Sequence, residues 1–256
     1  MSAQRVYYYE DDELKKAIVT ARYRFSLEII KDKVVLDIGC GARRGPQILS
    51  SAATRVIGCD ISYEAVYFCV RTWPRANLSY LVSDARYLPF ADCSFDAVTS
   101  FEVIEHLDGH ERFLREVQRV LKPGCAVVIS TPNKPVLSPT GTYSNPDHVI
   151  EFDKQDFERA LRGYFTDIVL YGQHVTDRVK AIEGVRSANM RAVSRIPRAI
   201  KTFVPARLKE CILKKLHNGV ATIAKGVSEH TINEADFFIS GSNIEQARHL
   251  IAVCKK

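Results

Sequence analysis

The stretch Val35-Leu36-Asp37-Ile38-Gly39-Cys40-Gly41 combines an apolar run, an acid and two glycines at residues 35–41. The apolar run at 34–38 is typical of a buried parallel strand that ends in a glycine-rich turn. Glycines after such a strand let the backbone approach a nucleotide-like ligand closely. Asp37 precedes the glycines, where dinucleotide sites carry an apolar residue. Its carboxylate favours a cationic ligand group and would repel a pyrophosphate.

Strand and helix patterns alternate outward from this turn. Apolar runs predict strands at 34–38, 55–60, 78–82, 95–100 and 126–130. Helical spacing predicts helices at about 11–31 and at 109–121. A first-turn proline marks a helix that begins at about Pro46, and Ser62 is the expected N-cap of a helix that ends at Val70. After a loop at 132–146, the pattern predicts a helix at 154–161 and strands at 165–171, 237–240 and 250–254. Short connections between such elements indicate parallel βαβ units. We expect an α/β fold, with a Rossmann-like, doubly wound, mostly parallel seven-stranded sheet and helices on both faces.

Charge is unevenly distributed along the 256 residues. The net charge is +6, yet residues 174–217 alone carry +8 and the remainder −2. We therefore expect a basic helical cap insert at 174–233, with the main domain at 1–173 and 234–256. Three interpretations of the insert stay open. It packs as a helical cap, it contacts an anionic membrane surface and admits a lipid-linked substrate, or it binds RNA phosphates. Nucleic acid is the least favoured because Phe203 is the only aromatic side chain there for base stacking.

The remaining composition constrains the cellular context. Seven scattered cysteines, an odd number without a CxxC pair, indicate reduced thiols rather than a disulfide framework or a zinc site. The first 13 residues contain no apolar targeting region, and no run approaches the roughly 18–20 apolar residues of a membrane span. We expect a cytoplasmic protein, with peripheral membrane contact through the basic cap as the alternative. The oligomeric state is left open.

Two further acids follow neighbouring strands. Asp60 ends the second strand, where an acid accepts hydrogen bonds from ribose hydroxyls. Asp84 follows the third strand, where an acid can accept from an adenine amino group. Together with Asp37, these acids indicate that the ligand is a nucleoside with a cationic amino-acid group, as in S-adenosylmethionine.

The motifs resemble a known family. VLDIGCG (35–41), CDIS (59–62), SDARYLPF (83–90), SFDAVTSFEVIEHL (94–107) and VLKPG (120–124) are similar to those of class I S-adenosylmethionine-dependent methyltransferases, the ubiquinone-biosynthesis O-methyltransferases among them. The resemblance implies S-adenosylmethionine as cofactor. It implies cofactor contacts at Asp37, Gly39, Cys40, Gly41, Asp60, Ile61, Asp84, Ala85 and Phe101. Tyr23 joins them because Arg22-Tyr23-Arg24-Phe25 resembles an upstream helix motif that covers the cofactor. The chain departs at Arg43, where many members have a glycine, and we expect Gly45 to supply that turn instead.

The segment Glu102-Val103-Ile104-Glu105-His106 carries candidate catalytic groups. Spacing of i, i+3 and i+4 would place Glu102, Glu105 and His106 on one side of a helical turn. With His148 they offer two carboxylates and two imidazoles, which could hold Mg²⁺ or a similar divalent ion. Resemblance to methyltransferases with an ExxEH motif and a later histidine adds weight to this metal site. Without a metal, Glu102 lines the cofactor pocket and His106 or His148 acts as general base.

These observations predict an S-adenosylmethionine-dependent methyltransferase that acts on an oxygen of a small-molecule, glycan or lipid-linked acceptor. The alternative is an RNA-modifying, 2′-O-type enzyme that uses a divalent metal. A nicotinamide dehydrogenase is disfavoured by Asp37 and by the incomplete G-x-G-x-x-G pattern. A non-catalytic cofactor-binding subunit is disfavoured by the intact 102–106 segment.

Overall fold

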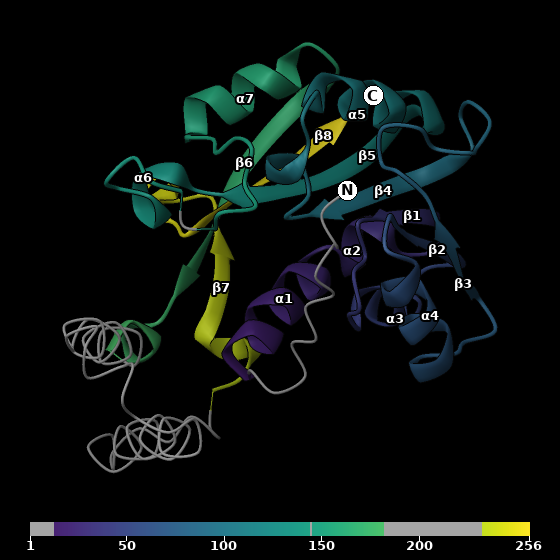
Figure 1. Ribbon diagram of the computed structural model, residues 1–256, viewed down its shortest axis with the longest axis horizontal. Coiled ribbons are helices and arrows are strands. Elements are labelled where there is room, and N and C mark those ends of the chain that lie inside the picture. Colours follow the sequence, from purple (N-terminus) through teal and green to yellow (C-terminus); the bar gives the residue numbers. More distant parts are fainter. Residues whose placement is uncertain (1–12, 144, 182–231) are drawn as a thin grey trace, which may run out of the picture.

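The computed structural model describes residues 13–143, 145–181 and 232–256 (Figure 1). Their central feature is an eight-stranded sheet in the order β3-β2-β1-β4-β5-β8-β6-β7. The strands are β1 (Val34–Ile38), β2 (Arg55–Asp60), β3 (Leu78–Val82), β4 (Phe95–Phe101), β5 (Leu121–Pro132), β6 (Thr166–Val175), β7 (Phe237–Ser240) and β8 (His249–Lys255). The first six strands run in one direction, and β7 and β8 run against them. The expected α/β fold with a mostly parallel sheet is confirmed.

The expected number of strands, seven, is wrong by one. β6 continues to Val175, past the expected end at Tyr171, and its last residues pair with the four-residue edge strand β7. This edge strand is the segment 237–240 that the pattern predicted, so all eight strands were located although the expected sheet counted only seven.

The helices are α1 (Glu13–Phe25), α2 (Leu27–Ile30), α3 (Gly45–Leu49), α4 (Tyr63–Thr72), α5 (His110–Val120), α6 (Lys134–Leu137) and α7 (Lys154–Arg162). The single helix expected at about 11–31 is divided at Ser26 in its described part. The Ser26 hydroxyl donates to the Tyr23 carbonyl oxygen at 2.8 Å, so the side chain competes for a backbone acceptor and the helix ends there. Of the described helices, none is long and apolar enough to cross a bilayer.

Both faces of the sheet are covered (Figure 1), as expected for a doubly wound fold. α5 and α7 pack on one face through Phe113, Val117 and Phe157, which belong to the same buried core cluster as Leu36 and Ile38 of β1. α1, α2 and α3 cover the other face, where Val35 of β1 lies. Because side chains alternate along a strand, Asp37 points to the same face as Val35 and lies beneath α1.

A small third hydrophobic cluster contains residues from α1, from the end of the range 145–181 and from the start of the range 232–256. Ala17 of α1, Val175 of β6, Val179, Ile232 and Phe237 of β7 pack together, and residues 177–181 are helical. His174 and Val175, placed in the expected cap insert at 174–233, belong to β6. The greater part of that insert, 182–231, lies outside the described residues.

Candidate active site

The glycine-rich turn follows β1 and reverses sharply. Gly39 and Gly41 have φ angles of 71° and 56°, a region that favours glycine. The backbone N–H groups of Gly39 and Cys40 donate to the Cys59 carbonyl at the end of β2, at 2.8 and 3.0 Å. A Cβ on Gly39 would lie 2.2 Å from Val103 Cγ2. The turn is therefore built for glycine at both predicted positions, and Cys40 between them is buried.

Asp37 lies fully buried under α1. The hydroxyl of Thr99 on β4 donates to Asp37 Oδ1 at 2.7 Å, and the hydroxyl of Tyr23 on α1 donates to Oδ2 at 2.9 Å. Burial raises the pKa of Asp37 to about 7, although the two hydrogen bonds act in the opposite direction. Phe101 completes this cluster, with its ring edge-on to Tyr23 at 4.8 Å between centroids. Three predicted cofactor residues, Asp37, Tyr23 and Phe101, therefore meet at one place.

Asp60 faces the turn from the end of β2. Its Oδ2 accepts from the Gly41 N–H at 2.8 Å and its Oδ1 accepts from the Ser62 N–H at 2.9 Å. Ser62 caps α4 as expected, accepting from the Ala65 N–H. Ile61 between them is 48% exposed, which leaves an apolar side chain at the open edge of the turn.

Asp84 lies in the loop after β3, and its hydrogen-bond donors come from Arg86 in the same loop. Its carboxylate accepts from Arg86 Nε at 3.0 Å and from Nη2 at 2.7 Å. The Arg86 hydrogen bonds hold the pKa of Asp84 below its usual range, so the group is an anion. The adjacent Ala85 is buried.

The expected role of Gly45 is wrong. Gly45 is not among the glycines with positive φ, so it does not supply the turn. It begins α3, and a Cβ there would lie 2.0 Å from Tyr23 Cζ. The missing side chain lets α1 approach α3, so Gly45 fixes the position of Tyr23 over Asp37.

Glu102 is not on a helical turn with Glu105 and His106, contrary to expectation. It follows β4 with φ of 58°, and only Ile104–His106 form a turn of 3-10 helix, η1. The left-handed backbone directs the Glu102 carboxylate beneath α1, 3.1 Å from Arg22 Nη1. Oε1 also accepts from the Ser130 hydroxyl at 2.8 Å.

Three neighbours hold the Glu102 carboxylate in place. His249 Nε2 of β8 lies 3.3 Å from Oε2, and burial lowers the pKa of His249 to about 3, so this histidine is a neutral donor. Burial raises the pKa of Glu102, but the Arg22 guanidinium and the other neighbours, the Ser130 hydrogen bond among them, together more than offset it, and the pKa ends below the usual range. Glu102 is thus an anion that ties α1 to the sheet.

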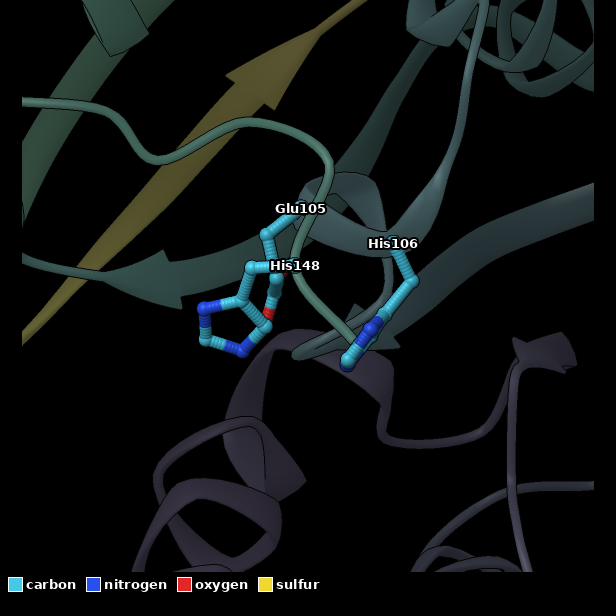
Figure 2. Close-up of side chains that lie close together, drawn as sticks. All are labelled: Glu105, His106 and His148. Atoms are coloured by element: carbon cyan, nitrogen blue, oxygen red, sulfur yellow. The ribbon is translucent and has the colours of Figure 1, made fainter. Parts of the chain in front are cut away.

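Glu105, His106 and His148 converge (Figure 2). One ligand atom from each lies within 4.8 Å of the others, and the two imidazole rings are 4.9 Å apart between centroids. Glu105 and His106 come from η1, and His148 comes from the loop before α7. The N–H groups of Val149 and Ile150 donate to the Glu105 carbonyl, which docks that loop on η1. Of the four predicted metal ligands, the structure brings together these three without Glu102.

The Glu105 carboxylate is buried, and only one of its two oxygens accepts a hydrogen bond within the described residues. Oε2 accepts from the Thr131 hydroxyl at 3.3 Å, whereas Oε1 has no hydrogen-bond partner among the described residues. Burial, and then the charge of Glu102, raise the pKa of Glu105 well above its usual range. An unpartnered buried acceptor beside two imidazoles suits a cation or a donor from a ligand.

Both histidines have their Nδ1 atoms occupied. His106 Nδ1 lies 3.0 Å from the Asp147 carbonyl oxygen, and His148 Nδ1 lies 2.6 Å from Glu151 Oε1. Since both partners are acceptors, each Nδ1 carries the proton, and in the neutral ring Nε2 has a free lone pair. Burial lowers the pKa of His106, which favours its neutral form.

Several site residues were not predicted. Arg22 and His249 hold Glu102, Thr99 holds Asp37, and Glu151 orients His148. Two of them had a local signal, because Glu151 stands three residues after His148 and Arg22 belongs to the 22–25 motif. Thr99 and His249 come from distant strands, and their roles follow from the sheet order.

Comparisons with known proteins agree with this geometry. Residues 36–129 match the family described as "Methyltransferase domain". A "probable S-adenosylmethionine-dependent methyltransferase" of Mycolicibacterium smegmatis is 36% identical over 128 residues, 50% of this chain and 49% of that protein. A fatty-acid O-methyltransferase of the same species is 28% identical over 208 residues, 80% of this chain and 68% of that protein.

A solved structure shares the fold. A methyltransferase from Thermotoga maritima superposes with a TM-score of 0.63 at 13% identity, over 97% of this chain and 94% of that one. The chain spans about half the length of the first curated relative. Residues 36–129 of the chain therefore contain a methyltransferase domain, and the chain is similar to S-adenosylmethionine-dependent methyltransferases in sequence and fold.

Proposed function

We propose that the protein transfers the methyl group of S-adenosylmethionine to an oxygen of a small-molecule, glycan or lipid-linked acceptor. The observation that carries this proposal is the pair His106 and His148, each with Nδ1 bound to an acceptor and Nε2 open to receive a proton. Similarity to a fatty-acid O-methyltransferase supports an oxygen acceptor. The relatives reported above give the RNA alternative no support.

The cofactor chemistry fits the residues at the ends of β1 and β2. Gly39 and Gly41 allow close approach of a nucleoside, and Asp60 at the end of β2 offers carboxylate oxygens to ribose hydroxyls. Asp37 offers a buried negative charge to the amino group of the methionine end. Bound there, S-adenosylmethionine supplies an activated methyl group on a sulfonium.

The proposed reaction is an in-line displacement. The acceptor oxygen forms a bond to the methyl carbon while the carbon–sulfur bond breaks, and the electron pair goes to sulfur. His148 Nε2 accepts the acceptor's hydroxyl proton, and Glu151 at Nδ1 stabilises the imidazolium that forms. Most of the acceleration comes from alignment of the oxygen behind the methyl group.

A divalent metal is the alternative to the His148 base, because the single lone pair on Nε2 cannot both bind an ion and accept the proton. Glu105, His106 and His148 are the residues that would hold it, and the unpartnered Oε1 of Glu105 fits a ligand position. Hydrogen bonds to both Nδ1 atoms orient the imidazoles as in known metal sites. A bound ion would lower the pKa of an acceptor hydroxyl. Glu102 acts instead through Arg22 as a positioning residue for α1.

The decisive experiment screens acceptors for release of S-adenosylhomocysteine, with and without EDTA and added Mg²⁺. His148→Ala should lower kcat by about 10²–10⁴-fold, the usual contribution of a general base. Its affinity for S-adenosylhomocysteine should stay unchanged in calorimetry. His174→Ala, at the edge pair of β6 and β7, is the matched control. Full activity of His148→Ala would refute the base, and turnover unaffected by EDTA would refute the metal.

We further propose a lipid-linked acceptor reached from a membrane surface. This rests on the charge of residues 174–217, which is +8. Cationic amphipathic helices bind anionic bilayers. Co-sedimentation of the full chain with anionic but not neutral vesicles, lost at high salt, would support the proposal. Absence of binding to anionic vesicles would refute it.

A further inference from the structure

A buried glutamine of β6 holds the turn of α1 that leads to Tyr23. Gln173 is fully buried. Its Oε1 accepts a hydrogen bond from Arg22 Nε at 2.6 Å, and its Nε2 donates to the Ile18 carbonyl oxygen at 2.8 Å. Ile18 and Arg22 are four residues apart, so they lie on the same side of α1. One side-chain amide therefore binds both the main chain and a side chain of this helix.

The two partners of Gln173 require a primary amide. Oε1 meets a guanidinium, which can only donate, and Nε2 meets a carbonyl oxygen, which can only accept. A carboxylate in place of the amide would accept from Arg22 but repel the Ile18 carbonyl oxygen. An apolar side chain would take this acceptor away from the buried Arg22 Nε, at the cost of desolvating a charged donor.

The guanidinium of Arg22 is held at two atoms. Nη1 lies 3.1 Å from the Glu102 carboxylate, in addition to the contact between Nε and Gln173. His249, which contacts the other oxygen of Glu102, is directly paired with Gln173 across β8 and β6. Arg22 is thus fixed between Glu102 after β4 and the paired strands β6 and β8. Tyr23 follows it directly in the sequence, so the position of one sets that of the other.

The position of α1 depends on such contacts. The helix lies outside the matching methyltransferase domain at residues 36–129, and the break at Ser26 separates it from α2. The chain into β1 therefore leaves the direction of α1 to be set by its contacts with the sheet and with α3. The Tyr23 hydroxyl donates to Asp37 Oδ2 at 2.9 Å. Since O–H···O bonds span about 2.5–3.0 Å, a small shift of α1 would break this bond.

We propose that Gln173 is a positioning residue for cofactor binding. It fixes α1 through Arg22 and the Ile18 carbonyl, and this places the Tyr23 hydroxyl on Asp37 before S-adenosylmethionine binds. The inference rests on the proposed cofactor site at Asp37. The side-chain hydrogen bonds of Gln173 go to α1, so its effect on the cofactor passes through that helix. A preorganised site binds its ligand more tightly, because less ordering is needed on binding.

The first experiment needs no cofactor. Gln173→Met keeps the length of the side chain and removes both hydrogen bonds. In the ligand-free chain, hydrogen exchange should become faster at the amides of residues 18–25 and stay unchanged in α5. Gln246→Met is the matched control, because it replaces an exposed glutamine of the 3-10 turn η4 (Ile244–Gln246). Its exchange should equal that of the unmodified chain.

Calorimetry with S-adenosylhomocysteine tests the link to the cofactor. Gln173→Met should lower the affinity about tenfold, and Gln246→Met should leave it unchanged. A double-mutant cycle with Tyr23→Phe separates this role from a general loss of structure. If Gln173 acts through Tyr23, Gln173→Met should change the affinity by less than about twofold once Tyr23→Phe is present. A structural defect elsewhere would lower the affinity equally in both backgrounds.

Three results would overturn the proposal. They are unchanged exchange of α1 in folded Gln173→Met, unchanged affinity for S-adenosylhomocysteine, and an equal loss of affinity with and without Tyr23→Phe. If Gln173→Met does not fold, Gln173→Glu takes its place, because it still accepts from Arg22 and loses the donor to Ile18, and the same three results decide. An unmodified chain that does not bind S-adenosylhomocysteine would refute the proposed cofactor site and this inference with it, whereas the three results refute the inference alone.

Discussion

Cofactor affinity should depend on pH through Asp37. The pKa of this buried carboxyl is raised to about 7, first of all by burial. At pH 5 the ligand-free protein therefore holds Asp37 almost entirely in its neutral form. The amino group of S-adenosylhomocysteine is a cation throughout pH 5–7, because α-amino groups titrate near 7.7–8.0. Its binding favours the Asp37 anion, so the proton must leave when the ligand binds.

The magnitude follows from the distance between pH and pKa. Two pH units below the pKa, about 1% of the molecules carry the Asp37 anion. If binding requires that anion, affinity at pH 5 falls up to about 100-fold relative to its limit above pH 7, or about 2.7 kcal/mol. The sign is fixed: affinity rises with pH from 5 through 7, where about half of the molecules carry the anion, and levels off about one pH unit higher.

Isothermal titration calorimetry at pH 5, 6 and 7 measures this dependence. Buffers with different heats of ionisation count the protons released, and close to one is expected at pH 5–6. Asp37→Asn, which cannot ionise, should bind more weakly at pH 7 and show no such dependence. Equal affinity of the unmodified chain at pH 5 and pH 7, or no proton release, would refute the reasoning.

Three further predictions concern the framework of the site. Gly45→Ala should weaken cofactor binding and stability, because its Cβ would overlap the Tyr23 ring, whereas Gly163→Ala, with open space around it, should change neither in calorimetry and urea denaturation. Glu102→Gln should lower the free energy of unfolding by about 3–5 kcal/mol, since it leaves the Arg22 guanidinium buried without its carboxylate; a loss under 1 kcal/mol in urea denaturation would contradict the buried ion pair. Phe113→Ala, at a fully buried ring of α5, should cost about 3–5 kcal/mol by the same measurement, with a smaller loss showing that the site collapses around the cavity.

Sequence patterns gave much of the site as well as the fold. The glycine turn, the acids at 37 and 60 and the pairing of His148 with Glu105 and His106 were all expected from spacing or resemblance, and the structure brings these groups to the carboxyl ends of the strands. The predicted position of Glu102 was wrong. Helical spacing grouped it with Glu105, but one left-handed residue after β4 turned it beneath α1.

The sequence by itself determined the class of fold and the cofactor loop. Apolar periodicity, glycine and proline act through the backbone of a few neighbouring residues, so the strands, helices and turns that they produce can be predicted from local sequence. Only the tertiary structure decided which charges meet. Arg22 and His249 reach Glu102 from α1 and β8, and β7 pairs with the end of β6, because packing and sheet order set these distances. A buried charge needs a partner from whichever element lies opposite, and no local pattern records that element.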